Sequence, residues 1–183
     1  MQNVKLSFAL CVIAGTLSSC SSNPAYSDLA STYPLSKPTI DYSARLPQRI
    51  QPRYEKVVLI DPNVHAWGAY NPDGDLVRAG QATAGSDWCF DMGRPCNTKS
   101  GTFRVYSLGS PDCKSTIFPI PKGGAPMPYC MFFNRGQAMH GVHEGEVVDG
   151  NISHGCVRMH IPDAEWLRYN FVNVGTKVIV KSY

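Results

Sequence analysis

One short stretch of the chain, 153–159 (SHGCVRM), holds a histidine and a cysteine on either side of a glycine. A thiol with its ordinary pKa of about 8.5 is only a few per cent ionised at neutral pH, so it becomes an effective nucleophile where an imidazole can take its proton. His140 lies far enough upstream for a strand and a returning loop to bring its imidazole to the thiol of Cys156. The spacing therefore allows nucleophilic chemistry at Cys156, with the imidazole of His140 within reach of its thiol.

Two other interpretations of the same region remain open. Imidazole and thiolate are zinc ligands, and this region offers several of them: His140, His143, His154, Cys156 and His160. Yet it contains no HExxH motif and no carboxylate at a helical offset from paired histidines, so we expect no metal. Alternatively, a buried cysteine beside a glycine would be inert, with histidines that only satisfy hydrogen bonds of the core.

The elements that must position these residues are mostly β-strands. Runs of β-branched and aromatic residues predict strands within 55–61, 64–70, 75–85, 101–109, 129–136, 137–142 and 176–183. Only 162–171 (PDAEWLRYNF) has apolar residues at helical spacing, with a proline suited to the first turn of a helix. The sequence shows no internal repeat and no second domain. We therefore expect a mainly β fold, a single β-rich domain over 51–183 with a short helix near the C-terminus.

The composition of the 183 residues is that of a globular chain. Hydrophobic residues make up 43% and charged residues 17%, which separates the chain from disordered proteins. The formal net charge is only +3, without a run of lysine or arginine. Because nucleic-acid binding relies on a strongly basic surface, we expect no nucleic-acid partner.

The N-terminus has the features of a signal peptide. Lys5 precedes an apolar stretch from Leu6 to about Leu17, which suits the core of a signal peptide and is too short to span a bilayer comfortably. Small residues then lead to Cys20. We expect residues 1–19 to be a signal peptide that is removed on export; a buried helix is the alternative.

Residues 17–20 (LSSC) resemble the lipobox of bacterial lipoproteins, in which the cysteine is lipidated and becomes the first mature residue. Acyl chains on Cys20 would anchor the protein to a membrane, since each buried methylene contributes about 0.8 kcal/mol. Ser21, in place of Asp, resembles the pattern that sorts lipoproteins to the outer membrane. The Ser- and Pro-rich stretch 20–50 predicts a flexible tether. We expect a periplasmic lipoprotein; a soluble exported protein and a folded N-terminal segment are the alternatives.

Four further cysteines are candidates for disulfide bonds: Cys89, Cys96, Cys113 and Cys130. Exported proteins meet an oxidising compartment, and the odd number of cysteines left after removal of the signal peptide and lipidation predicts one free thiol, Cys156. The four can pair in three ways. We favour the two local pairs, Cys89–Cys96 and Cys113–Cys130, because each closes one loop at a gain of about 2–4 kcal/mol. A four-cysteine zinc site is disfavoured by the long spacings.

The histidine and cysteine motifs together resemble those of the L,D-transpeptidase (YkuD) family, the penicillin-insensitive peptidoglycan cross-linkers. His140-Gly141, followed by SHGCVR, matches the family pattern of HG and then SHGC[VI]R. The stretch TKSGTFRVYSLG resembles the family's TPxGTFxV strand, and PMPYCMFF resembles its MPYxMxF strand before the HG motif. The likeness covers about residues 55–182, and the paired HG and SHGC motifs are highly specific.

The resemblance implies a catalytic role for four residues. Cys156 is expected to be the nucleophile, and His140 its general base and later its acid. The group that orients the imidazole in the family is a backbone carbonyl, here that of Gly141, so no aspartate is needed. Backbone N–H groups near Gly155 and Cys156 are expected to stabilise the tetrahedral oxyanion, and Gly155 lets the substrate approach the backbone closely.

The resemblance also implies residues that bind substrate. Ser153, His154 and Arg158 match motif positions that shape the substrate site, and Arg158 could bind a carboxylate of the peptide stem through its two-pronged guanidinium. A structural ion pair is the alternative for Arg158. Tyr129 is expected to line the pocket. Cys130 departs from the family pattern, which commonly has an aromatic residue there, so a Cys113–Cys130 bond would alter the pocket edge and with it the choice of acceptor.

The activity implied by the resemblance is peptidoglycan L,D-transpeptidation. The thiol would attack the bond next to the terminal D-Ala of a tetrapeptide stem, release D-Ala and pass the acyl group to an acceptor amine on a stem peptide or a protein. No metal or organic cofactor is expected. L,D-carboxypeptidase or amidase action shares the acyl-enzyme step, and a non-catalytic peptidoglycan-binding lipoprotein is a further alternative. His143 and His160 match no role in the family and are expected to be surface or loop residues.

Overall fold

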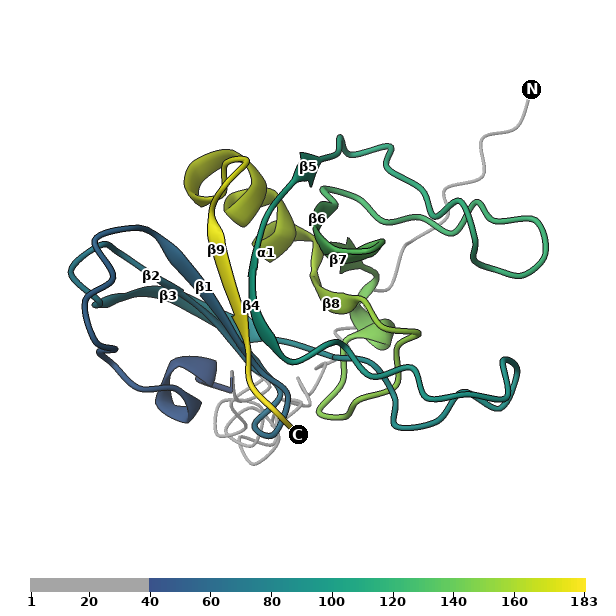
Figure 1. Cartoon of the computed structure of the whole chain (residues 1–183), viewed down its shortest axis with the longest axis horizontal. Coiled ribbons are helices and arrows are strands. Elements are labelled where there is room, and N and C mark those ends of the chain that lie inside the picture. Colours follow the sequence, from purple (N-terminus) through teal and green to yellow (C-terminus); the bar gives the residue numbers. More distant parts are fainter. Residues whose placement is uncertain (1–39) are drawn as a thin grey trace, which may run out of the picture. The chain divides into compact units, whose positions relative to one another are not determined.

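This computed structural model describes residues 40–183 of the chain. They fold into two β-sheets and one short helix, joined by loops and turns (Figure 1). The predicted signal peptide (1–19), the predicted lipidation site at Cys20 and most of the predicted tether lie outside the described residues. Within residues 40–183, every helix is too short or too polar to cross a bilayer. The fold is mainly β, as the sequence predicted.

The first sheet has five strands in the order β3-β2-β1-β9-β4. These strands are β1 (Val57–Asp61), β2 (Ala66–Tyr70), β3 (Leu76–Gln81), β4 (Gly101–Arg104) and β9 (Lys177–Val180). β1 lies in the middle, antiparallel to β2 and parallel to β9. Because all residues of β1 and β2 are buried, β1 appears in the sequence as a continuous apolar run rather than an alternating one.

The second sheet has four strands in the order β5-β6-β7-β8. They are β5 (Ser107–Leu108), β6 (Met131–Asn134), β7 (Gln137–Val142) and β8 (Val157–His160). β6 and β7 form a tight hairpin, and a parallel pairing joins β7 to β8 through a long return that contains the 3-10 turn η3 (Glu144–Glu146). The sequence did not predict β8, which is only four residues long and follows directly on the SHGC motif.

The core lies between the two sheets and under the helix. α1 (Ile161–Trp166) continues as a π-helical turn, η4 (Leu167–Phe171), so the helix predicted over 162–171 is present. The main buried cluster joins side chains from both sheets and from these turns, among them Ile60, Trp67, Met131, Met139, Val157, Ala164, Leu167 and Phe171. The apolar spacing that predicted the helix is therefore the face by which it packs on the sheets.

The folded part of the chain begins before residue 51. A 3-10 turn, η2 (Tyr42–Arg45), precedes Leu46, which is buried in a second apolar cluster with residues of β1 and β2. The backbone N–H of Ile50 donates to the carbonyl of Gly74 at 2.8 Å. The tether predicted over 20–50 is thus too long at its C-terminal end, because its last residues pack on the first sheet.

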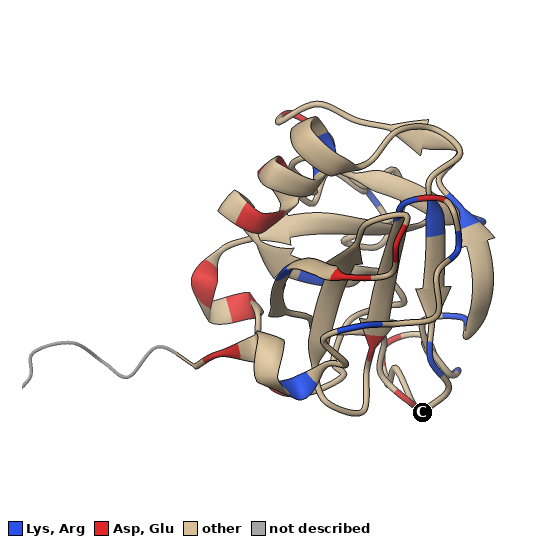
Figure 2. Ribbon diagram, turned by 90° about the vertical axis from the view of Figure 1, so that its left-hand side faces the viewer, with Lys and Arg blue, Asp and Glu red and all other residues tan. Residues whose placement is uncertain are grey.

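Two disulfide bonds close loops on the side of the second sheet. Cys89 is bonded to Cys96 and Cys113 to Cys130, with Cα–Cα distances of 5.9 and 6.2 Å, which is the local pairing that the sequence favoured. Cys156 is the free cysteine of the described residues. Figure 1 shows both loops extending away from strands β1, β2 and β3. In the view of Figure 2, basic and acidic segments are interspersed over the fold.

Candidate active site

The pairing of β7 with β8 brings the sequence-predicted nucleophile and base together. His140 of β7 is in register with Arg158 of β8. Side chains alternate between the faces of a strand, so His140, Cys156 and Arg158 share one face of the sheet. The opposite face carries fully buried core residues: Met139, Val157 and Met159. A slip of one residue would exchange the two faces, so burial of these core residues fixes the register of the site.

A pocket of about 420 Å³ opens on this face, and both His140 and Cys156 line it. Continuing the register by one residue places Cys156 beside Ala138, so it lies about 6.6 Å along the strand direction from His140. Most of the remaining lining comes from both disulfide loops and from neighbouring turns, within 94–97, 114–118, 125–127, 134–137 and 153–156, and it is completed by Phe132, Val142, Glu146 and Arg158.

His140 is held in one tautomer. Its Nδ1 is 2.9 Å from the carbonyl oxygen of Gly141, and because that oxygen can only accept, Nδ1 carries the proton and Nε2 is an acceptor. Burial lowers the pKa of His140 to about 4; the bond to Gly141 opposes this shift and the charge of Arg158 adds to it. The imidazole is therefore neutral at neutral pH and can act as a base through Nε2. The geometry expected for the Gly141 carbonyl is present.

Cys156 is a protonated thiol at rest. Burial raises the pKa of its thiol, while a hydrogen bond from the backbone of Ala138 and the charge of Arg158 act in the opposite direction. The sulfur also lies 3.9 Å from the carbonyl oxygen of Gly136. In the resting site the thiol of Cys156 and the imidazole of His140 are therefore both uncharged. Proton transfer must then accompany attack on a substrate.

The loop that carries the nucleophile is braced by Ser153. The N–H of Gly155 donates to Ser153 Oγ at 3.1 Å, and the same hydroxyl donates to the carbonyl of Cys156. Ser153 is buried, so although it lines the pocket its hydroxyl is occupied within the loop. Gly155 has φ +117°, and a Cβ there would come within 3.0 Å of the side chain of Gln137. Of the two N–H groups predicted to stabilise an oxyanion, that of Gly155 is already bonded.

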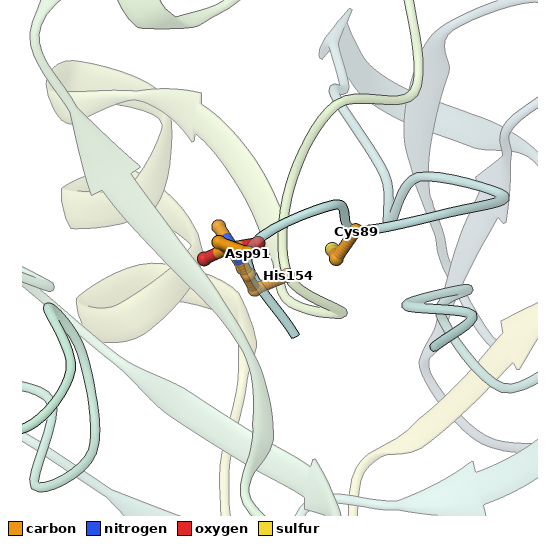
Figure 3. Close-up of side chains that lie close together, drawn as sticks. All are labelled: Cys89, Asp91 and His154. Carbon is orange, nitrogen blue, oxygen red and sulfur yellow. The ribbon is translucent and has the colours of Figure 1, made fainter. Parts of the chain in front are cut away.

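His154 connects the nucleophile loop to both disulfide loops. Its Nε2 lies 2.8 Å from Asp91 Oδ2 in the Cys89–Cys96 loop, and its ring lies against that of Phe118 in the Cys113–Cys130 loop, with centroids 4.6 Å apart. Figure 3 shows the imidazole of His154 beside the carboxylate of Asp91, with Cys89 further along the same loop. The resemblance placed His154 in the substrate site, and the structure places it on the pocket wall.

Three side chains of the types that bind metal ions lie together at the same place. Cys89, Asp91 and His154 each offer a ligand atom, and these atoms lie within 4.8 Å of one another (Figure 3). The sulfur of Cys89 is bonded to Cys96 and so is not a thiolate. Two ligands remain, fewer than the three or four protein ligands of known zinc sites. The donor set does not fit a zinc ion.

Three other sequence-predicted residues lie apart from the reacting pair. Tyr129 does not line the pocket, contrary to expectation: its φ of 60° turns the side chain toward the helical turns, where its hydroxyl donates to Glu165 at 2.9 Å. His143 and His160 line a separate hollow beside Pro162. The histidines that are close in the sequence are therefore divided between two places in the fold.

The pocket is lined by arginine and lysine side chains that form none of the ion pairs found within residues 40–183. Arg158 forms none of these pairs, so the structural ion pair considered for it is not present. Sequence reasoning missed three further cations of the lining: Arg94, Lys114 and Arg135. The first two lie inside the disulfide loops and the third at the β6–β7 turn, and nothing in their local sequence distinguishes them from ordinary surface residues.

Comparisons with known proteins identify the family of this fold. Residues 55–180 match the family profile of the L,D-transpeptidase catalytic domain, YkuD. An L,D-transpeptidase structure from Xylanimonas cellulosilytica is similar with a TM-score of 0.62 and 26% identity, over 75% of this chain and 66% of that chain. A search of curated protein sequences gives no significant match.

Two mycobacterial structures are similar at the level of the fold. An L,D-transpeptidase from Mycobacterium smegmatis has a TM-score of 0.56 at 23% identity, over 70% of this chain and 59% of that chain. L,D-transpeptidase 3 from Mycobacterium tuberculosis, in complex with a faropenem-derived adduct, has a TM-score of 0.55 at 23% identity, over 69% and 60%. The chain thus spans less than two thirds of the length of these relatives.

Proposed function

The chain belongs to the YkuD family of L,D-transpeptidase catalytic domains, and from this premise we propose that it is a peptidoglycan L,D-transpeptidase with Cys156 as its nucleophile. The observation that carries the proposal is the bond from His140 Nδ1 to the Gly141 carbonyl. It leaves Nε2 as an acceptor in the pocket that also contains Cys156. A thiol beside such an imidazole is the arrangement that nucleophilic catalysis requires.

The first half-reaction forms a thioester. Cys156 Sγ attacks the carbonyl carbon next to the terminal D-Ala of a tetrapeptide stem, and His140 Nε2 takes the thiol proton. The tetrahedral oxyanion accepts a hydrogen bond from the N–H of Cys156. As the intermediate collapses, the C–N bond to D-Ala breaks and His140 returns the proton to the leaving amine, so D-Ala departs neutral at its amine.

The second half-reaction transfers the acyl group. An amine of the acceptor attacks the thioester carbonyl and gives a proton to His140. The C–S bond then breaks, and the sulfur recovers its proton from the imidazole. An amine on a second stem peptide gives a cross-link, and an amine on a protein gives an attached protein. Neither half-reaction needs a metal ion or an organic cofactor.

The pocket lining has four cations, Arg94, Lys114, Arg135 and Arg158, against one carboxylate, Glu146, and this excess of positive charge supports an anionic peptide as substrate. Stem peptides end in carboxylates, and Arg158 lines the pocket without an ionic partner among the described residues. A guanidinium can bind a carboxylate through two parallel hydrogen bonds. We assign Arg158 to the donor stem because it lies in register with His140 and so close to the bond that is cut.

The N-terminal sequence supports a place for this reaction outside the cytoplasm. The signal peptide over 1–19 and the lipobox at Leu17–Cys20 belong to the proposal as an exported, lipid-anchored protein of the periplasm, at the outer membrane. Two disulfides in the catalytic domain agree with an oxidising compartment. A membrane partner is thus proposed through the lipid on Cys20, and the cell wall supplies the substrate.

The proposal is tested with purified full-length protein, a synthetic tetrapeptide stem and an isotopically labelled amine acceptor. Mass spectrometry should show loss of D-Ala, a thioester on Cys156 and a labelled cross-linked product, all absent with Cys156→Ala. Tripeptide without labelled product would identify a carboxypeptidase instead. Binding of the stem without a thioester would identify a binding protein and contradict the proposal.

A further inference from the structure

Thr98 is a buried residue of the TKSGTF motif that has no role in the reaction described above. It is fully buried and does not line the pocket. Its hydroxyl accepts a hydrogen bond from the N–H of Gly85 at 2.9 Å and donates one to the carbonyl of Gly155 at 3.0 Å. Gly155 immediately precedes the nucleophile, so Thr98 holds the backbone next to Cys156.

A second hydroxyl completes this network. The N–H of Thr98 donates to the hydroxyl of Tyr183 at 2.8 Å, and Tyr183 donates to the carbonyl of Gly85 at 2.8 Å. Each hydroxyl thus gives one hydrogen bond and accepts one, which fixes the direction of all four bonds. A Cβ on Gly85 would lie 2.1 Å from the carbonyl oxygen of Cys96, so the two backbone segments touch at this point. Four hydrogen bonds thus join the segments that support Gly155.

The bond to Thr98 determines the orientation of one peptide group. The peptide between Gly155 and Cys156 is planar and trans, so its C=O and its N–H point in opposite directions. The carbonyl faces the buried Thr98, and the N–H of Cys156 therefore faces away from it. Glycine at φ +117° leaves this peptide freer to rotate than another residue would, which makes a fixed acceptor–donor pair important.

We propose that Thr98 is a positioning residue that aims the N–H of Cys156 at the oxyanion before the substrate arrives. The inference rests on the proposed function. The N–H of Gly155 is engaged by Ser153, so the N–H of Cys156 is the donor left to stabilise the charge. Donors that are oriented in advance accelerate acyl transfer because they need no rearrangement as the charge develops. Loss of the Thr98 hydroxyl frees the peptide to rotate and weakens this donor.

The test compares two reactions of the same sulfur in the full-length protein. Alkylation of Cys156 by iodoacetamide needs the thiol and its base but forms no oxyanion. Acylation by the tetrapeptide donor needs both. We expect Thr98→Val, which keeps the shape and removes the hydroxyl, to lower the acylation rate constant by about 100-fold with little change in KM. Its alkylation rate should stay within about twofold of wild type. Thr98→Ser should acylate nearly as fast as wild type.

The matched control is Thr83→Val. Thr83 is likewise fully buried, and its hydroxyl exchanges two hydrogen bonds with the backbone of Val148 rather than with Gly155. It should show no selective loss of acylation. If Thr98→Val does not fold, as judged by circular dichroism, Thr98→Ala gives the same comparison.

Equal loss of alkylation and acylation, or full acylation without the hydroxyl, would overturn the role of Thr98 while leaving the proposed function intact. Failure of the wild-type protein to be acylated at all would instead overturn the proposed function, and this inference with it.

Discussion

Cationic side chains form ion pairs near the first sheet but not around the pocket. Near the first sheet, cations are matched with carboxylates: Arg49–Asp75, Arg78–Asp163, Arg104–Glu55, Lys177–Glu55 and Lys181–Asp61. Around the pocket, the arginine and lysine side chains of the lining take part in none of the ion pairs of the described residues.

The difference separates two uses of charge. Pairs at the surface contribute little to stability each, but they leave the protein's own charges satisfied. The hydrogen bond to Arg104, followed by that to Lys177, lowers the pKa of Glu55 to about 2. Unpaired cations around a concave site instead leave a positive potential for an external anion. The charges near the first sheet are thus satisfied within the fold, and those of the cations that line the pocket are not.

The largest expected effect comes from the reacting pair itself. Cys156→Ala and His140→Ala should each lower turnover of a tetrapeptide donor by about 10⁴-fold or more, and the double variant should be little worse, because residues that act in one step are strongly non-additive. Thermal unfolding should remain near that of wild type. Kinetics on the four proteins, wild type included, check this.

His143→Ala is the control for the reacting pair, since His143 lines a separate hollow. It should keep its turnover. An equal loss of turnover in His143→Ala and His140→Ala would mean that the histidines act as one cluster. The contrast between the pocket and the first sheet would then not hold.

As the pH falls, stability should be lost first through a group in the pocket and only at lower pH through a group near the first sheet. The pKa of His140 is about 4 in the fold against 6.5 for an ordinary histidine, so between these values the unfolded chain binds more protons than the folded one. The stability is full above pH 6.5, falls as the pH drops toward 4, and loses about 3 kcal/mol over that window. Urea unfolding of wild type and His140→Gln at several pH values measures it; the variant should lack this decline.

Glu55→Gln provides the counterpart from the first sheet. The pKa of Glu55 is lowered from 4.5 to about 2, so its contribution to stability is present above pH 4.5 and is lost only as the pH falls toward 2. Between pH 6.5 and 5 this variant should follow the wild-type slope. If the decline of stability with falling pH vanished in Glu55→Gln and persisted in His140→Gln, it would have to be assigned to Glu55 and not to His140.

Two arginines give the smallest and most direct comparison. Arg158→Gln should lower kcat/KM by about 10- to 100-fold, as expected for the loss of charged hydrogen bonds to a substrate, and should leave the Tm nearly unchanged. Arg78 pairs with Asp163 at 2.8 Å and lies 4.8 Å from the ring centroid of Trp166, so Arg78→Gln should cost about 1 kcal/mol of stability without affecting kcat/KM. Kinetics and thermal melts of both variants measure this. A loss of stability in Arg158→Gln with a loss of kcat/KM in Arg78→Gln would contradict the prediction.

The sequence was most informative where residue type alone carries the chemistry or the packing. The paired HG and SHGC motifs predicted that His140 and Cys156 act together, and the structure brings both to one pocket. Ala164, Leu167 and Phe171 form the buried face of the helical turns because the helical period repeats in any surroundings. Local disulfides could be favoured because each needs only a loop that returns on itself.

Other features depend on contacts that no local pattern encodes. β8 is a strand because it pairs with β7, and four residues after a motif carry too little periodicity to predict it. Tyr129 matched a family position, yet its positive φ directs the ring to Tyr169 and Glu165. Thr98 supports Gly155 across 57 positions of sequence, and only the assembled fold brings them into contact.

The parallel pairing of β1 with β9 makes the order of folding unusually dependent on the end of the domain. β9 lies between β1 and β4, so β4 joins the first sheet only after the last strand has arrived. Closing so long a loop carries a large entropic penalty before any contact compensates for it, which places such topologies among slow folders of high contact order. Tyr183, beyond β9, then bonds Thr98 and Gly85 beneath the nucleophile loop. Until β9 has joined the first sheet, the reactive thiol therefore lacks its finished surroundings, and its supporting hydrogen bonds form only with the last strand of the domain.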